Sequence, residues 1–364
     1  MKIRHVLMFM LAVVCCTLRV HGEELPIEVS AQAAIIYDAD YGQVLYAKHA
    51  DEKMLIASTT KIMTAVVVLE QCDPNEVVHI TDEMTNVEGS SMYLQSGKDY
   101  TVKQLLYGLM LASGNDAATA LAIHVAADEH AFAEMMNEKA KMLGLANTSF
   151  ANPHGLDDTN HYSTAFDMAC LMAYAMNDGR FAEIVGARSV NIQNLTYVNH
   201  NKLLWQCEGV IGGKTGYTMA AGRTLVTCCE REGQRLICVT LSASDDWNDH
   251  KRMYDLVYDA YEPYVLAEKD TRYLIPLFTG EGKSIAAEPL CDVTVFTASL
   301  ADVECTVELP KFAFAPIYRG DYAGRILVKQ KGKTVEVFPL VYMENYGIEN
   351  TMRFRGDEIV YCPI

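Results

Sequence analysis

Residues 57–72 read ASTTKIMTAVVVLEQC, a cluster of small hydroxyl residues that leads into a mostly apolar run. The apolar residues fit one face of a helix, and Ser and Thr are favoured where a helix begins. The pattern therefore predicts a helix with an apolar face that begins near Ser58. Ser58 and Lys61 stand three residues apart, so a helix places both side chains on the same face.

A second helical region, residues 101–145, follows along the chain. It is rich in Leu, Ala and Met at helical spacing and is interrupted once, by Ser-Gly-Asn at residues 113–115. Residues 147–162 carry Pro, Gly, His, Asn and Asp, which predict a long loop. Residues 163–176 then return to a helical pattern.

Strands are predicted on both sides of this helical middle. Residues 33–50 form apolar runs around a polar turn at residues 38–42, which indicates a hairpin. Beyond residue 211, GGKTGYT leads into RTLVTCCE and, after a Glu-Gly turn, RLICVTLSA, which predict two antiparallel strands. Residues 247–261 are typical of one closing helix. We therefore expect an α+β domain whose terminal strands share one sheet.

The last third of the chain has a different texture. Residues 263–277 are typical of a connector, and short β-rich runs follow: DVTVFTA, DVECTVEL, GRILVKQ and KTVEVFPL. We expect a first domain over residues 23–265 and a small all-β domain over residues 275–364. The second domain contains no candidate catalytic group.

Length and composition bound the classes of function. The chain has 364 residues, which suggests two or three domains, and an ordinary globular content of 50% hydrophobic and 21% charged residues. Its 30 Lys and Arg against 47 Asp and Glu give a net charge of −17. A protein that binds nucleic acid needs a basic footprint, so this balance argues against nucleic acid and against electrostatic docking on an anionic bilayer.

The first 22 residues resemble an export signal. Lys2, Arg4 and His5 precede an apolar stretch at residues 6–18, and small residues precede Glu23. The apolar stretch is too short to span a bilayer comfortably. We expect a signal peptide over residues 1–22 and no integral membrane segment after its cleavage. The final run, residues 344–364, lacks helical apolar spacing, so we expect a soluble, extracytoplasmic protein of the cell wall or periplasmic space.

Cysteine and histidine give little sign of a metal site. Removing Cys15 and Cys16 with the signal leaves nine of the eleven cysteines, an odd number without a CxxC pair, so buried free thiols are expected. His154 and His161 are the only close histidine pair in a loop, and no HExxH occurs. We therefore expect neither a metal nor a cofactor in the chemistry.

Ser58 and Lys61 are the first candidates for catalysis. A serine hydroxyl is a poor nucleophile and needs a neighbouring base. Lysine can be that base where burial or a second cation favours its neutral amine. The spacing alone is common, and by itself it also fits a solvated lysine in the first turn of a helix.

Two further motifs change the balance between these interpretations. Ser113, Gly114 and Asn115 break a helical region, where such residues are costly without a reason. Lys214, Thr215 and Gly216 open a strand after two glycines, so backbone can approach a ligand closely. A phosphate-binding loop would need a following helix, whereas a strand follows here.

SxxK, SxN and KTG, in this order, are the motifs of penicillin-binding proteins and serine β-lactamases. Further runs resemble the low-molecular-weight penicillin-binding proteins, which are serine-type D-Ala-D-Ala carboxypeptidases: GSSMYL (89–94), LLYGLMLASGNDAA (105–118), NPHGL (152–156), HYSTAFD (161–167) and GKTGYTMAAG (213–222). The resemblance covers residues 28–261, and the trailing β domain resembles that family's C-terminal module. It implies a β-lactamase/transpeptidase-like domain in which an antiparallel sheet carries a cluster of helices.

The resemblance also implies catalytic roles. Ser58 would attack the carbonyl between the two terminal D-alanines of a peptidoglycan stem peptide, and Lys61 would take its proton. Ser113 would relay a proton to the leaving nitrogen, with Lys214 nearby. Asn115 would hold the substrate backbone amide. β-Lactam antibiotics would be covalent inhibitors.

The remaining roles concern recognition of the substrate's anionic end. Lys214 and Thr215, followed by Gly216, would receive the terminal carboxylate. The backbone N–H groups of Ser58 and Tyr217 would form an oxyanion hole. His200 stands where relatives often place an arginine, and would be a pH-dependent carboxylate partner, unless Lys202 substitutes or His200 is an ordinary surface residue.

Three rival functions share this fold. A class A β-lactamase needs a glutamate in an E-x-x-L-N loop, and the glutamates between the second and third motifs lack Leu-Asn at that offset. An endopeptidase that cuts peptidoglycan cross-links would use the same residues. A non-catalytic wall-binding protein is the alternative from a different class.

Overall fold

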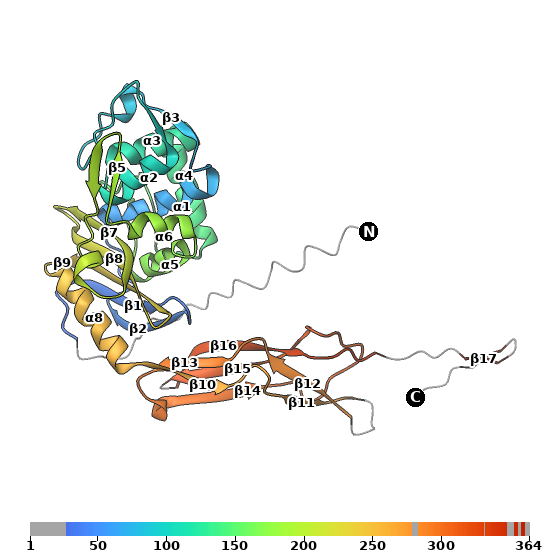
Figure 1. Cartoon of the computed structure of the whole chain (residues 1–364). Coiled ribbons are helices and arrows are strands. Elements are labelled where there is room, and N and C mark those ends of the chain that lie inside the picture. Colours follow the sequence, from blue (N-terminus) through green and yellow to red (C-terminus); the bar gives the residue numbers. More distant parts are fainter. Residues whose placement is uncertain (1–26, 279–282, 331, 348–352, 356–357, 361–364) are drawn as a thin grey trace. The chain divides into compact units, whose positions relative to one another are not determined.

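The computed structural model describes residues 27–278, 283–330, 332–347, 353–355 and 358–360 (Figure 1). The chain divides into two units, Met1–Asp259 and Ala260–Ile364. The expected signal peptide, residues 1–22, lies outside the described residues, as does much of the final run 344–364. Among the residues that the structure describes, no helix combines the length and apolar character needed to cross a membrane.

A five-stranded antiparallel sheet organises the first unit, in the order β2-β1-β9-β8-β7. Its strands are β1 (Ala33–Asp38), β2 (Gln43–Lys48), β7 (Val210–Thr218), β8 (Gly222–Arg231) and β9 (Gln234–Ala243). Because β1 pairs with β9, the two ends of the unit's sequence meet in one sheet, which confirms the predicted arrangement.

Helices fill the sequence between the strands and close the unit (Figure 1). They are α1 (Lys61–Gln71), α2 (Val102–Leu111), α3 (Asn115–Ala126), α4 (Glu129–Met142), α5 (Ala165–Ala175), α6 (Gly179–Gly186), α7 (Leu203–Gln206) and α8 (Asp246–Ala260). Short turns and hairpins connect them: the 3-10 helices η1 (Ala57–Thr60) and η2 (Asp82–Met84), the pair β3 (Val77–His79) and β4 (Asp99–Thr101), and the pair β5 (Ser189–Ile192) and β6 (Leu195–Val198).

The sheet lies between two helical layers. α5 packs on β1, β8 and β9. On the opposite face, α8 contacts the alternate side chains of β8 and β9: His250 Nδ1 lies 2.8 Å from Thr227 Oγ1, and Tyr254 Oη lies 2.7 Å from the same hydroxyl. Successive strand residues point to opposite faces, so both faces of the sheet are covered.

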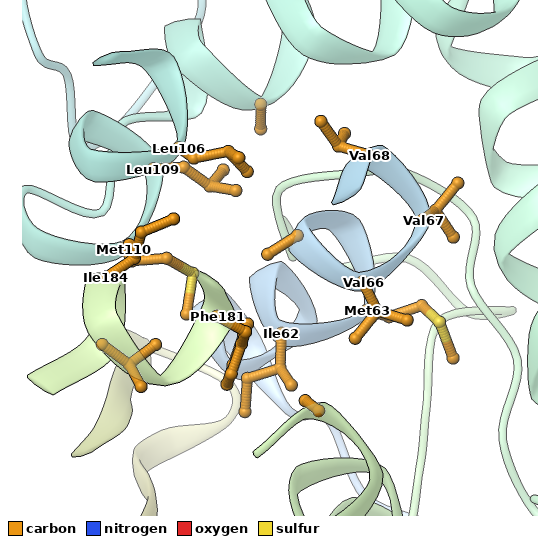
Figure 2. Packing of buried hydrophobic residues seen from close by; sticks show 14 of the residues in the cluster. Ile62, Met63, Val66, Val67, Val68, Leu106, Leu109, Met110, Phe181 and Ile184 are labelled. Atoms are coloured by element: carbon orange, nitrogen blue, oxygen red, sulfur yellow. The ribbon is translucent and has the colours of Figure 1, made fainter. Parts of the chain in front are cut away.

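α1 runs through the centre of the helical layer, and every residue from Lys61 to Leu69 is buried. Figure 2 shows the apolar side chains of α1, among them Ile62, Met63 and Val66, packed against side chains of two other helices. These are Leu106, Leu109 and Met110 of α2 and Phe181 and Ile184 of α6. Burying each large apolar side chain contributes about 1.5–3 kcal/mol. The first helix is therefore held rigidly from all sides.

Three local predictions are wrong in detail. The helical region 101–145 breaks twice, because Ala127 takes a left-handed conformation (φ 69°) between α3 and α4. The hydroxyl cluster forms η1, and its Thr side chains bond carbonyls of the preceding turn instead of capping α1. Lys214 and its neighbours lie within β7, paired with β8, and do not open a strand.

The second unit is all-β, as expected. β10 (Glu262–Ala267) pairs with β13 (Val293–Thr297), and a second sheet has the order β11-β12-β16-β15-β14. The members of that sheet are β11 (Tyr273–Pro276), β12 (Ser284–Pro289), β14 (Val303–Glu308), β15 (Tyr322–Gln330) and β16 (Lys333–Tyr342). The short helix η3 (Leu300–Asp302) and the pair β17 (Arg353–Arg355) and β18 (Glu358–Val360) complete it.

The boundary between the units lies earlier than the sequence predicts. Residues 262–265, assigned to the first domain, pair with β13 of the second unit. Much of the predicted connector, residues 263–277, forms β10 and β11. β10 and β11 contain Tyr, Val, Leu and Ile, which favour a half-buried strand, so these residues join the sheets of the second unit instead of forming a connector.

Candidate active site

The turn η1 presents Ser58 beside the first residue of α1. Lys61 is fully buried, Ser58 is half-buried, and Lys61 Nζ lies 2.9 Å from Ser58 Oγ. The residue before Ser58, Ala57, has φ 47°, a strained conformation for a residue with a side chain. The strain persists because the surrounding loops hold this turn, which orients the serine.

Two uncharged oxygens complete the surroundings of the Lys61 amine. Nζ donates to Asn115 Oδ1 and to the carbonyl oxygen of His154, each at 2.7 Å. Asn115 Nδ2 donates to the Glu88 carbonyl at 2.5 Å, which fixes the orientation of its amide. A neutral amine has two N–H donors and one lone pair. In this neutral form the two carbonyl acceptors use both donors, which leaves the lone pair for the Ser58 hydroxyl.

The electrostatics of the site also favour a neutral Lys61. Burial lowers the pKa of Lys61 well below its ordinary value, and the charge of Lys214 lowers it further, while Asp116 opposes the change. Removing an ammonium from water is costly, and a neighbouring cation adds repulsion. These effects favour the neutral amine of Lys61, the form that can accept a proton from Ser58.

Ser113 and Lys214 form a second hydroxyl–amine pair. Ser113 lies in the turn between α2 and α3 with φ 58°, and Lys214 Nζ is 3.0 Å from Ser113 Oγ. The same amine donates to the Thr215 carbonyl at 2.7 Å. Burial lowers the pKa of Lys214 to about 7. This pair can pass a proton as well as bind an anion.

β7 runs close to the nucleophile along Gly216 and Tyr217. A Cβ on Gly216 would lie 2.9 Å from the Ser58 backbone nitrogen and 2.4 Å from Thr224 Oγ1, so only glycine fits there. Tyr217 follows with a side chain that is 66% exposed. The strand backbone can therefore approach a substrate that is bound at Ser58.

His200 lies apart from the hydroxyl–amine pairs, in a neighbouring groove of about 1060 Å³. Lys202, Trp205, Tyr93 and Leu195 line the same groove. Partial burial lowers the pKa of His200, and the charge of Lys214 adds to this effect. The structure thus places His200 within electrostatic reach of Lys214, and gives it no contact with Ser58 or Lys61 among the described hydrogen bonds.

Buried Asp116, next to Asn115, is a site residue that the sequence reasoning missed. Its carboxylate accepts from the backbone N–H groups of Met92 and Leu94 at 2.9 and 3.0 Å, and from Ser91 Oγ at 2.6 Å. These bonds hold the loop that carries the GSSMYL run against the start of α3. The GSSMYL run was the only part of this contact that the sequence analysis singled out, and it did not indicate a role for Asp116.

Gly155 is the second missed residue. It has φ 90°, and a Cβ at this position would lie 1.9 Å from the carbonyl oxygen of Ala57. The loop containing NPHGL therefore packs directly on the backbone that precedes Ser58. In the sequence, only the presence of a glycine within a loop indicated a special role for Gly155. Its partner Ala57 is about a hundred residues away in the chain, so the sequence did not indicate this contact.

The two loop histidines lie close to the turn that carries Ser58. His161 Nδ1 accepts from the Ala151 N–H at 3.1 Å, so Nε2 carries the proton and faces Thr60 Oγ1 at 2.7 Å. His154 Nδ1 accepts from the Leu156 N–H at 3.2 Å. Burial lowers the pKa of both imidazoles, that of His161 to about 4 and that of His154 to about 3. Both rings are neutral, hydrogen-bonded structural elements.

Known proteins share this sequence and this fold. Residues 19–245 match the peptidase S11 family, described as D-alanyl-D-alanine carboxypeptidase. The D-alanyl-D-alanine carboxypeptidase DacF of Bacillus subtilis (strain 168) is 32% identical over 332 residues, which cover 86% of this chain and 85% of DacF. DacC of Escherichia coli (strain K12), with the same description, is 34% identical over 340 residues, 87% of this chain and 84% of DacC.

A solved structure agrees with the two sequence relatives. The crystal structure of penicillin binding protein 5 from Haemophilus influenzae aligns with a TM-score of 0.80 at 28% identity, and the alignment covers 89% of this chain and 99% of that chain. The likeness thus spans both units of the chain, and the family match contains all three motifs of the site. The chain belongs to the peptidase S11 family of D-alanyl-D-alanine carboxypeptidases.

Proposed function

We propose that the protein is a serine-type carboxypeptidase that removes the terminal D-alanine from peptidoglycan stem peptides ending in D-Ala-D-Ala. The observation that carries this proposal is the contact between Ser58 Oγ and the buried amine of Lys61, whose other two partners are uncharged carbonyl oxygens. This arrangement supplies a nucleophile and its base without a histidine. The names of the family and of its relatives supply the substrate class.

Acylation would begin when Lys61 Nζ takes the proton of Ser58 Oγ and the oxygen attacks the carbonyl between the two D-alanines. The negative charge that develops on the carbonyl oxygen would be bound by the backbone N–H groups of Ser58 and Tyr217, each such donor being worth about 10²–10³ in rate. Ser113 would relay to the leaving nitrogen the proton that Lys61 took from Ser58, supported by Lys214 at 3.0 Å, so Ser113 keeps its hydroxyl and Lys61 returns to its neutral form. The C–N bond then breaks, and D-alanine leaves.

The substrate would be positioned by its anionic end and its backbone. Lys214 and Thr215 would bind the terminal carboxylate, with Gly216 leaving room for its approach, and His200 would add a charge only at acid pH. Asn115 would hold a substrate amide. Water would then hydrolyse the Ser58 ester with Lys61 as base. β-Lactam antibiotics would acylate the same serine, and the resulting acyl-enzyme would hydrolyse slowly.

The site of action would be outside the cytoplasm. The basic and apolar pattern of residues 1–22 supports export, and peptidoglycan is an extracytoplasmic substrate. We propose that the mature protein meets stem peptides in the cell wall or periplasmic space.

Two mass measurements test the proposed function. The purified protein is incubated with a pentapeptide ending in D-Ala-D-Ala, and the products are identified by mass spectrometry; the intact protein is weighed after treatment with penicillin. We expect release of one D-alanine and one penicilloyl adduct, both absent from Ser58→Ala and retained in Ser189→Ala, a matched exposed serine on β5.

Other outcomes separate the rival functions. Cleavage of a cross-linked dimer in preference to the pentapeptide would identify an endopeptidase, and rapid turnover of penicillin would identify a β-lactamase. A protein that forms no adduct and releases no D-alanine would be a non-catalytic homologue, and the proposal would be wrong.

A further inference from the structure

Three side chains of metal-ligating types meet at the end of the helical layer away from Ser58. The ligand atoms of Cys72, Glu76 and His124 all lie within 4.8 Å of one another, and His124 Nε2 is 3.2 Å from Glu76 Oε2. Cys72 is half-buried, and the side chain of His124 is 25% exposed. Thiolate, imidazole and carboxylate are the ligands that Zn²⁺ takes in proteins.

Hydrogen bonds from backbone N–H groups hold the loop that carries Glu76 in place. The Asp73 N–H donates to Glu76 Oε1 at 2.8 Å, and the Val102 N–H donates to the Glu76 carbonyl at 2.9 Å. The Lys103 N–H donates to the Pro74 carbonyl at 2.8 Å. One carboxylate oxygen is therefore used by the loop, while the other, Oε2, faces His124 and can bind a cation.

Two helices end at this cluster. Cys72 is the C-cap of α1, and His124 lies in the last turn of α3. The C-terminal end of a helix carries about half a negative charge, so both helices favour a cation at this position. The net charge of −17 acts in the same direction.

We propose that Cys72 Sγ, Glu76 Oε2 and His124 Nε2 bind one Zn²⁺ ion, with water as the fourth ligand. Tetrahedral ligation at about 2.0–2.3 Å places ligand atoms about 3.3–3.8 Å apart. The pair His124–Glu76 is already at 3.2 Å, so closure requires Cys72 and its partners to approach by only about 1 Å from their separation of up to 4.8 Å. Binding releases the Cys72 proton to solvent and leaves the thiolate on the metal.

The ion would join the far ends of the two helices that begin at the active site. Lys61 is the first residue of α1 and Asn115 the first of α3, and these residues share the 2.7 Å hydrogen bond described above. At about 1.5 Å per residue, the cluster is about 15 Å from that bond along the helices. Zn²⁺ would thus stabilise the helical layer without touching the reacting atoms.

Co²⁺ and Zn²⁺ titrations of the full mature protein, reduced and free of chelator, test the site. Co²⁺ bound by a thiolate gives a sulfur-to-metal charge-transfer band that water, imidazole and carboxylate do not give. We expect one Co²⁺ per chain with this band, its displacement by Zn²⁺, and a higher unfolding temperature with Zn²⁺ that EDTA reverses. The matched controls are Cys305→Ser, an exposed cysteine of the second unit, and His130→Asn, an exposed histidine of α4.

Two ligand variants decide the outcome. Cys72→Ser should lose the charge-transfer band, and His124→Asn should weaken Zn²⁺ binding at least about tenfold, since even outer-shell changes cost 10–100-fold. Both controls should bind as the unaltered protein does. Should Cys72→Ser fold poorly, His124→Asn, at a partly exposed position, still tests the site. Equal Zn²⁺ affinity in His124→Asn and the unaltered protein, or a missing thiolate band in the latter, would mean adventitious surface binding and overturn the proposal.

Discussion

Replacing Asn115 by aspartate should inactivate Lys61 mainly through the charge that it adds. The substitution keeps an oxygen at the position of Oδ1, 2.7 Å from Lys61 Nζ, and replaces the amide nitrogen that donates to the Glu88 carbonyl. The side chain keeps its size and shape, while an uncharged acceptor becomes an anion. An anion at this distance favours the ammonium form of Lys61, which has no lone pair for the Ser58 proton.

The size of the effect follows from the same distance. With an effective dielectric constant of about 20, Coulomb's law at 2.7 Å gives an attraction of about 6 kcal/mol. The cost of burying the new carboxylate offsets part of it, and we take about half, roughly 3 kcal/mol, as the net bias toward the ammonium. At 1.36 kcal/mol per factor of ten, the equilibrium between amine and ammonium shifts about 100-fold toward the ammonium, which raises the pKa of Lys61 by about 2.

The assay is the second-order rate of acylation by a fluorescent penicillin between about pH 5 and 10. Because the reactive form is the neutral amine, the rate falls as pH drops through the pKa of Lys61, and a raised pKa moves this fall to higher pH. On the acid limb, below the pKa of Lys61 in both variants, Asn115→Asp should therefore react about 100-fold more slowly than Asn115→Ala, and the difference should shrink in alkali. Asn115→Ala removes the same hydrogen bonds without adding a charge. If the acid limbs of the two variants coincide, Lys61 is not the base.

Four further outcomes are expected. Ser58→Ala should abolish covalent penicillin labelling and D-alanine release with an unchanged circular dichroism spectrum, because only the nucleophile is lost. Lys61→Arg replaces the amine by a guanidinium that cannot deprotonate, so the acylation rate should fall to near background. Gly155→Ala places a Cβ 1.9 Å from the Ala57 carbonyl in a left-handed conformation, so urea unfolding should show a loss of more than about 2 kcal/mol. Burial lowers the pKa of Lys214 to about 7, and its ammonium is lost as pH rises through that value, so the KM for a carboxylate-bearing peptide should rise in alkali while acylation by an uncharged ester should not change.

Periodicity and motif order were enough to predict the architecture. Apolar runs separated by polar turns predicted the strands of the first unit, and the order of hairpin, helical middle and hairpin predicted that the terminal strands share a sheet, as β1 and β9 do. The same reasoning failed at residues 262–267, where a short strand without a turn signal was taken for a connector. Short edge strands carry few residues, so their pattern is weak.

The contacts that orient the site could not be predicted from the sequence. The break at Ala127 has no glycine or proline to mark it, because Ala127 itself takes the left-handed conformation. Asp116 bonds a loop more than twenty residues away, and Gly155 packs on a carbonyl about a hundred residues away. Sequence spacing carries no information on such contacts until the fold is known.

The distribution of charge explains why one buried lysine can be a base and its neighbour an anion receptor. Asp116 is the buried carboxylate nearest in sequence to Asn115, yet its oxygens accept from Met92, Leu94 and Ser91 and so hold a loop. Lys61 is left with carbonyl partners, which favour its charged form less than a carboxylate would. Lys214, which bonds a hydroxyl and a carbonyl, adds a second positive charge that further disfavours an ammonium at Lys61. A substrate carboxylate at Lys214 would neutralise that charge. The base is therefore set by hydrogen bonds that exclude an anion from one amine, while the other amine stays open to the anion that the substrate brings.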